Sequence, residues 1–219
     1  MRKCRGMPYS KHPSITLCDL FKNRPFQGQD PSIAKILFLG LDANFAPTID
    51  KTDYFPLIKE YLEHGVNFWE KYHVHHPFLL PNFPKGDGVT YHKRFAKLKL
   101  NANRAKDISF VELLNIPTTG KTNYTQLKQL LNVDYLTDLE TKIRSNSHHK
   151  ILLLPKSVYN QLIKVKRDFK LFSWLPENIE SKFNKLNLIY QERYLKVYII
   201  TYFSAAISDT HINEIRNVI

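Results

Sequence analysis

Four short apolar segments recur along this chain, and they constrain its fold more than any other feature. They span residues 35–41, 108–114, 151–154 and 196–202, and polar or turn residues flank each of them. Nearly continuous apolar runs of this length are typical of strands that are buried on both faces, as in a parallel sheet. Residues 186–190 offer a candidate fifth strand beside the last one.

Helix-like segments separate these runs. Their patterns predict helices over 55–72, 91–100, 123–132, 156–168 and 209–219. Strands that alternate with helices indicate an α/β fold with helices on both faces of the sheet. We therefore expect one three-layer α/β/α domain over residues 1–219, with a central, mainly parallel sheet of four strands and the basic segment 1–30 packed on it. The 219 residues are enough for one such core.

Composition limits the classes of function. No apolar run approaches the roughly 20 residues that a membrane span needs, and the N-terminal MRKCRGMPYSKH lacks the apolar stretch of a secretory signal. We therefore expect a cytoplasmic, nucleoid-associated protein. Because Cys4 and Cys18 are its only cysteines, the chain offers neither a disulfide framework nor four thiolates for a zinc or iron–sulfur site.

The chain is strongly basic, since 32 Lys and Arg against 20 Asp and Glu give a formal net charge of +12. The excess is concentrated in residues 2–24, 85–106 and 156–170. Clustered positive charge attracts polyanions, so a nucleic-acid partner is favoured over a purely solubilising role. Charge alone does not separate DNA from RNA.

Polar residues follow the four main strands, and ligands of open α/β sheets bind beyond the carboxyl ends of the strands. Taken singly, Asp42, Asn115 or Ser204 is most simply a turn or helix cap. Taken together, such residues would meet at one edge of the sheet. Those expected there are Asp42, Asn44, Asn115, Lys156, Ser157, Ser204 and Ile207.

Asn115 also begins the segment NIPTTGKT, one residue short of the phosphate-binding pattern G-x-x-x-x-G-K-[ST]. That loop needs consecutive N–H groups that converge on an anion, and glycines that permit its backbone. Here the first glycine is absent and Pro117 has no N–H. A nucleotide-binding loop is thus the disfavoured interpretation, and Asn115 is better explained as a side chain at a strand end.

The motifs at the strand ends resemble those of the uracil-DNA glycosylase superfamily, in the same order and across nearly the whole chain. The turn GLDAN (40–44) is similar to the family's G-x-[DN]-P turn, and VELLN (111–115) is similar to its V-L-L-L-N strand. ILLLPKS (151–157) and YFSAAIS (202–208) occupy the places of the third strand and of the H-P-S-P-L-S motif. GVNFWEKY (65–72) resembles a helix of the mismatch-specific uracil and thymine branch.

The resemblance implies a uracil-DNA glycosylase-like fold and a monofunctional DNA glycosylase. Such an enzyme flips a pyrimidine out of the helix, hydrolyses its N-glycosidic bond without a cofactor or metal, and leaves an abasic site. Asp42, with Asn44 beside it, would activate the attacking water and stabilise the sugar cation. The partner would be double- or single-stranded DNA, bound by a monomer.

The resemblance also assigns the substrate contacts. Asn115 would read the edge of the flipped base, and Tyr54 or Phe55 would stack on it, although core burial is an equal explanation for Phe55. Ile207 would fill the gap that the flipped nucleotide leaves. Backbone phosphates would be held by Lys156, Ser157 and Ser204. The basic cluster over 85–106, apart from the resemblance, adds Lys93 and Arg94 as expected DNA contacts.

Two departures from the family pattern leave the substrate open. Tyr202 stands where the last motif has a histidine that donates to the base oxygen, and its hydroxyl could donate to the base instead. His75 or His76 could contact the base or act as a general acid, and His211 could replace the missing histidine. Asn44 stands where uracil-specific enzymes carry an aromatic that excludes the thymine methyl. The base could be uracil, mismatched thymine, an oxidised pyrimidine or a hypermodified phage cytosine, in DNA repair or anti-phage defence. The missing histidine also motivates a rival, an inactive DNA-binding module of the same fold.

Overall fold

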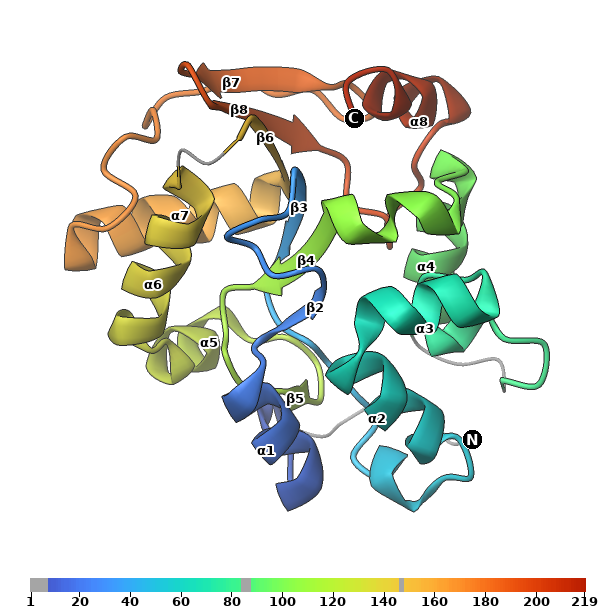
Figure 1. The fold of residues 1–219 in the computed structure, drawn as a ribbon. Helices are drawn as coiled ribbons and strands as arrows, with labels where there is room; N and C mark the ends of the chain where they lie inside the picture. The colour runs from blue at the N-terminus through green and yellow to red at the C-terminus, as the bar shows by residue number, and fades with distance from the viewer. Residues whose placement is uncertain (1–7, 84–87, 146–147) are drawn as a thin grey trace.

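A six-stranded sheet lies at the centre of the protein (Figure 1). The computed structural model describes residues 8–83, 88–145 and 148–219. Within them the strand order is β2-β4-β3-β6-β8-β7, with the inner four strands parallel and β2 and β7 antiparallel at the edges. The strands are β2 Phe26–Gly28, β3 Ile36–Gly40, β4 Ile108–Glu112, β6 Lys150–Pro155, β7 Asn187–Gln191 and β8 Leu195–Ile200.

The expected mixed α/β fold with a mostly parallel sheet is confirmed, but the expected number of strands is wrong. The described residues form six strands in this sheet rather than four. The four apolar runs are β3, β4, β6 and β8, and the candidate fifth strand is β7. β2 escapes prediction because it has three residues, FQG, and no apolar pattern.

The order of the parallel strands creates a switch point. The chain places β4 on one side of β3 and then β6 on the other side. In open α/β sheets, ligands bind beyond the carboxyl ends of the strands where the winding reverses in this way. The residues after β3 and β6, which include Asp42 and Lys156, therefore flank the expected binding position.

Helices cover both faces of the sheet. α6 (Val133–Arg144) and α7 (Lys156–Phe169) pack against aliphatic strand residues, and we call this the aliphatic face. α3 (Gly65–Tyr72), α4 (Val89–Phe95) and α8 (Asp209–Arg216) pack on the other side, which we call the aromatic face because Phe38, Phe95, Phe110 and Phe203 meet there. Figure 1 shows α6 and α7 to the left of the sheet, and α3 and α4 to its right.

The expected helix over 55–72 is two helices, α2 (Phe55–Glu63) and α3, which meet at His64. The interruption lets Gly65 approach Gly28, where a Cβ on Gly65 would come within 2.6 Å of the Gly28 nitrogen. α6 and α1 (Ile15–Asn23) lie outside the expected helices. The other elements are α5 Tyr124–Leu130 and the 3-10 helices Ile49–Lys51, Pro77–Leu79, Ala96–Leu98 and Ala102–Asp107.

The N-terminal segment is tied to the loop that follows β4. β1 (Ser10–Lys11) pairs antiparallel with β5 (Thr118–Thr119). Residues 1–7, which include Cys4, lie outside the described residues. No helix in the described ranges is long and apolar enough to cross a membrane.

Candidate functional site

Asp42 lies just beyond the carboxyl end of β3, and its carboxylate is held by polar groups from distant parts of the chain. The hydroxyl of Tyr9 donates to Asp42 Oδ2 at 3.0 Å, and the hydroxyl of Thr118 donates to the same oxygen. Asn44 Nδ2 lies 3.5 Å from it. These contacts fix the carboxylate at the switch point, where the sequence predicts it.

Asn44 is close to Asp42, as expected, but its strongest contacts are with the loop around β5. Its amide donates to Thr118 Oγ1 at 3.1 Å and to the Gly120 carbonyl at 3.0 Å. The Thr118 N–H in turn donates to the Ala43 carbonyl at 2.9 Å. Asn44 therefore positions Thr118 beside the carboxylate.

The same contacts oppose the nucleotide-binding interpretation of this loop. The Thr118 N–H is used by Ala43, and Thr119 pairs with Ser10 in the ladder of β1 and β5. A phosphate cradle needs such N–H groups free and converging. The loop instead holds the Asp42 carboxylate through the Thr118 hydroxyl.

Tyr9 and Thr118 were not predicted as site residues. Thr118 is fully buried and Tyr9 is 3% exposed. Thr118 lies several residues after the end of β4, within the short strand β5, and Tyr9 lies in the basic N-terminal segment. Neither residue directly follows one of the four predicted strands, so the position after a strand does not identify them.

Glu112, the last residue of β4, is a second carboxyl at this edge. It pairs in register with Gly40, and its carboxyl occupies the space that a side chain at Gly40 would need, with Oε2 2.0 Å from an ideal Cβ there. Oε2 is sealed from solvent and has no hydrogen-bond partner in the described part of the chain. Burial, and then the charge of Asp42, raises the pKa of Glu112 well above its usual value. An acid inside the apolar run ISFVELL was the available signal for it.

Asn115 follows three residues after Glu112 and is half-buried. Within the described residues its side chain has no recorded hydrogen bond, so both its donor and its acceptor are available to a ligand. This is the availability that a base-reading amide requires.

Tyr202 lies beyond the end of β8 and is half-buried, with its ring centroid 5.5 Å from that of Tyr91 on α4. Burial, followed by the charges of Glu112 and Asp42, raises the pKa of the Tyr202 hydroxyl. Tyr202 therefore keeps its phenolic proton and belongs to the surroundings of the two carboxyls.

The histidines form a stack on the aromatic face. The rings of His76 and His92 are parallel within 12° at 3.6 Å, and His75 Nε2 lies 3.1 Å from His92 Nδ1. Desolvation lowers the pKa of all three, that of His92 to about 3, so they are neutral at pH 7. Within the described residues no group of three or more His, Cys, Asp or Glu is arranged to hold a metal ion. His76 Nδ1 accepts from the Phe78 N–H, and no recorded contact joins His76 to Asp42.

The two candidates for base stacking lie at the start of α2 and have no recorded contact with Asp42. Tyr54 packs on Phe83 at 5.0 Å, and its hydroxyl donates to the Asn82 carbonyl. Phe55 is partly buried against the core cluster of α1, α2 and α3. Core packing thus accounts for Phe55.

Ile207 does not have the exposed position that a wedge in DNA needs. It is 9% exposed and packs into the core of the aromatic face. The resemblance implies a wedge because Ile207 occupies a motif position. In the structure the side chain is part of the core, where burial of its apolar surface stabilises the fold.

The residues expected at the DNA backbone differ in their surroundings. Arg94 Nη1 donates to the carbonyls of Phe203, Ser204 and Ala205, at 3.3 and 2.6 Å for the first two, so it fixes the loop after β8. Lys93 and Ser204 are exposed. At the start of α7, Lys156 lies over the ring of Tyr159 at 4.8 Å, beside half-buried Ser157.

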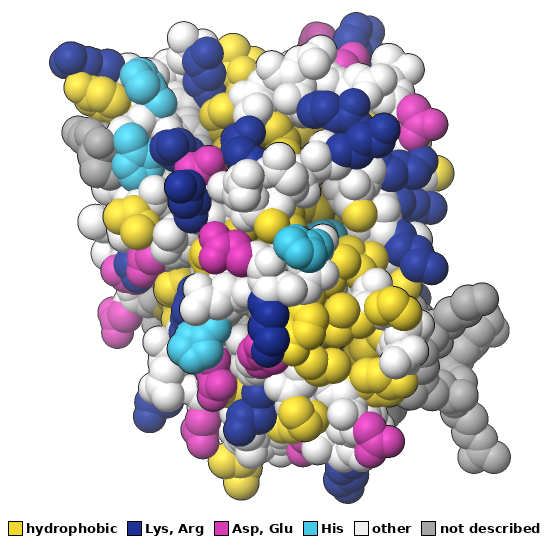
Figure 2. Space-filling model, turned by 45° about the vertical axis from the view of Figure 1, so that its right-hand side comes forward, with side chains coloured by type: hydrophobic (Ala, Val, Ile, Leu, Met, Phe, Trp, Pro, Cys, Tyr) yellow, Lys and Arg dark blue, Asp and Glu magenta, His cyan; other side chains and the backbone are white. Residues whose placement is uncertain are grey.

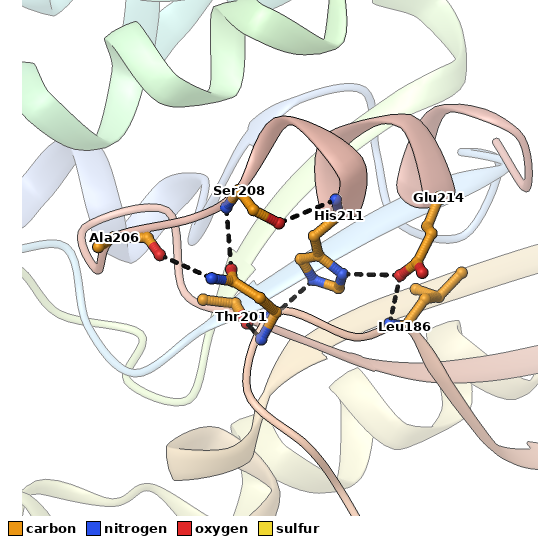
Figure 3. Close-up of polar contacts among 7 residues, drawn as sticks. Leu186, Thr201, Ala206, Ser208, His211 and Glu214 are labelled. Atoms are coloured by element: carbon orange, nitrogen blue, oxygen red, sulfur yellow. Dashed lines mark hydrogen bonds and ion pairs between the residues drawn. The ribbon is translucent and has the colours of Figure 1, made fainter.

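His211 does not replace the missing motif histidine, because both of its ring nitrogens have partners inside the protein (Figure 3). Its Nε2 accepts from the Thr201 N–H at 3.0 Å, and its Nδ1 lies 3.1 Å from Glu214. The side chain is fully buried. His211 joins α8 to the end of β8 and so holds the loop that carries Tyr202.

Figure 2 shows a hydrophobic area bordered by a histidine, with Lys and Arg side chains gathered above it and at its right. Exposed Lys93, Lys97 and Lys99 lie on α4 and the turns after it. Two hollows of about 430 and 440 Å³ lie elsewhere, one at the amino ends of β6 and β8 and the other on α6. Neither is lined by Asp42, Glu112 or Asn115.

Comparison of the chain with protein-family models, with curated proteins and with solved structures gave no match.

Proposed function

We propose that the protein is a monofunctional DNA glycosylase of the uracil-DNA glycosylase-like type, which flips a damaged, mismatched or modified pyrimidine and hydrolyses its N-glycosidic bond. One observation carries the proposal. A carboxylate fixed at the switch point, Asp42, lies at the same strand edge as a half-buried amide without a recorded partner, Asn115. The motifs of the sequence and the net charge of +12 support it.

The chemistry follows from the two groups. Positive charge develops on the sugar as the base departs, and a carboxylate fixed in advance stabilises that charge without having to reorganise. Asp42 also accepts the proton of the attacking water. The Asn115 amide offers a donor and an acceptor to the edge of the flipped base.

The test is release of a base. Duplex and single-stranded DNAs that carry uracil, mismatched thymine or hypermodified phage cytosine are incubated with the protein, and free bases are identified by mass spectrometry. Asp42→Asn keeps an acceptor for Tyr9 and Thr118 but removes the charge, and we expect it to lower kcat about 10²–10³-fold.

Asp138→Asn is the matched control, because Asp138 lies exposed on α6 and pairs with Lys142 at 2.8 Å. It is expected to keep the turnover of the wild type. No release of any base by the wild type would refute the proposal.

The rival is a DNA-binding module without catalysis, which the absence of the motif histidine favours. It predicts DNA binding that weakens steeply with salt, because counterions are released when Lys and Arg contact phosphates. It also predicts no base release, and no consequence of Asp42→Asn beyond a change in affinity. The assay above therefore distinguishes the two functions.

A further inference from the structure

The side chain of Glu112 has no structural role that explains its position. Its backbone carbonyl accepts from the Tyr135 hydroxyl at 2.8 Å, but no hydrogen bond to its carboxyl is recorded in the described ranges, and Oε2 is buried. A buried polar atom without a partner destabilises a fold. Gly40 makes room for this carboxyl, since any side chain there would overlap it. Two neighbouring strands are thus adapted to keep an unpaired acid.

The position of Glu112 connects it to the proposed reaction. Glu112 is two residues after Phe110 on β4, so its side chain points to the aromatic face. Its partner in the strand register is Gly40, which lies two residues before Asp42. The ionisable groups that interact with it come from several elements around it. They are Asp42 after β3, Tyr202 after β8, Tyr91 on α4, Tyr61 on α2, Tyr135 on α6 and Tyr9.

We propose that Glu112 is the general acid of this site and gives its carboxyl proton to the departing pyrimidine. The inference rests on the proposed glycosylase function and assigns the group that stabilises the leaving base. It supplies the donor that the last motif lacks, where Tyr202 replaces the family's histidine.

The step balances as follows. The bond between the sugar C1′ and the base nitrogen breaks, its electron pair goes to the base, and the proton of Glu112 neutralises the base. Water adds to C1′ and gives its proton to Asp42. Transfer of one proton from Asp42 through solvent to Glu112 then restores both groups.

The environment suits this division of roles. Burial and the charge of Asp42 raise the pKa of Glu112, which keeps it protonated at a pH where an exposed glutamate is ionised. Asp42 accepts hydrogen bonds from the hydroxyls of Tyr9 and Thr118, which hold its carboxylate in place at the end of β3. Two carboxyls whose surroundings differ in this way are typical of an acid and base pair.

The test is a leaving-group comparison with Glu112→Gln, which keeps the shape and a hydrogen-bond donor but has no proton to transfer. The substrates are the base that the wild type releases and an analogue with a more acidic ring, which for uracil is 5-fluorouracil. We expect kcat to fall about 10²-fold with the natural base and much less with the analogue, since a stable anion needs little help from an acid. The fall of wild-type kcat with rising pH should be absent from the variant.

Gly40→Ala provides an independent variant, because it keeps the acid and displaces it, and it should reproduce the same pattern. Glu140→Gln on α6 is the control; Glu140 accepts from Trp174 on the aliphatic face, and Gln keeps that acceptor. Thermal unfolding establishes that each variant is folded.

Three results would overturn the inference. Wild-type turnover and pH profile in both Glu112→Gln and Gly40→Ala would refute the role of Glu112 and leave the glycosylase intact. An equal loss with both bases would indicate a merely structural role. No base release by the wild type would refute the glycosylase and this inference together.

Discussion

The two faces of the sheet use alternate residues of the same strands, yet their chemistry differs. On the aliphatic face Leu37, Leu39, Val111, Leu152 and Leu154 pack under α6 and α7, and buried Lys150, at the amino end of β6, donates to the carbonyls of Pro31 and Lys142. On the aromatic face the intervening strand residues include Phe38 and Phe110 among isoleucines and Leu153, and Glu112 and the stacked histidines lie on the same side. Successive side chains of a strand point to opposite faces of the sheet, so each strand contributes alternate residues to the two faces.

Stability and candidate function depend on different parts of the sheet. Close-packed aliphatic side chains stabilise the fold and offer no chemistry. Buried ionisable groups without charged partners cost stability, and such groups cluster at functional sites. The aliphatic face thus stabilises the fold, and Glu112 links the aromatic face to the candidate site at the carboxyl edge of the sheet.

The largest expected effect is on the aliphatic face. Leu152→Ala removes a side chain that is 1% exposed at the centre of β6, and we expect the free energy of unfolding to fall by about 2–5 kcal/mol. Urea denaturation measures it. Leu188→Ala on edge strand β7, where the side chain is 45% exposed, is the control with little change. Equal losses at both positions would mean that the aliphatic face is not the stabilising one.

A smaller effect depends on pH and belongs to the aromatic face. The folded-state pKa of His92 is about 3, below its unfolded value of about 6.5, so the unfolded chain binds protons that the folded protein excludes. Stability is then present above pH 6.5 and is lost as pH falls, by about 1.4 kcal/mol per unit for each such histidine. Glu112, whose folded pKa is raised, acts in the opposite direction between its two pKa values.

His92→Phe should therefore reduce the loss of stability between pH 6.5 and 5.5, measured by urea denaturation at each pH. Exposed His64 provides the control, because His64→Gln should leave the slope as in the wild type. A slope unaffected by His92→Phe would show that His92 does not contribute to the acid sensitivity of the fold.

The smallest expected effect concerns an ion pair on the surface of the helices, away from the buried residues of either face. Lys128 on α5 and Asp168 on α7 form an exposed ion pair at 2.8 Å. A double-mutant cycle with alanine should give a coupling of about 0.2–1 kcal/mol that declines with salt. A larger coupling that does not depend on salt would mean that this surface pair affects stability as strongly as a buried polar group.

The sequence predicts the parallel core strands because a strand buried on both faces needs a continuous apolar run, and the run ILLLP of β6 is such a case. It misses β2, which is held by pairing with β4 rather than by its own pattern. At the site, position after a strand identifies Asp42 and Asn115. Tyr9 and Thr118 reach Asp42 across 33 and 76 residues, a tertiary contact that no local pattern contains. For Ile207, a motif position suggested exposure where packing demanded burial.

The short ladder between β1 and β5 has a consequence for the time course of folding. Ser10 and Lys11 are synthesised about a hundred residues before their partners Thr119 and Thr118. Closing so long a loop is entropically costly and follows only when the intervening strands hold the two ends near each other. We therefore expect Tyr9 to reach Asp42 among the last native contacts, so that the carboxylate gains this hydrogen bond only after most of the sheet has formed.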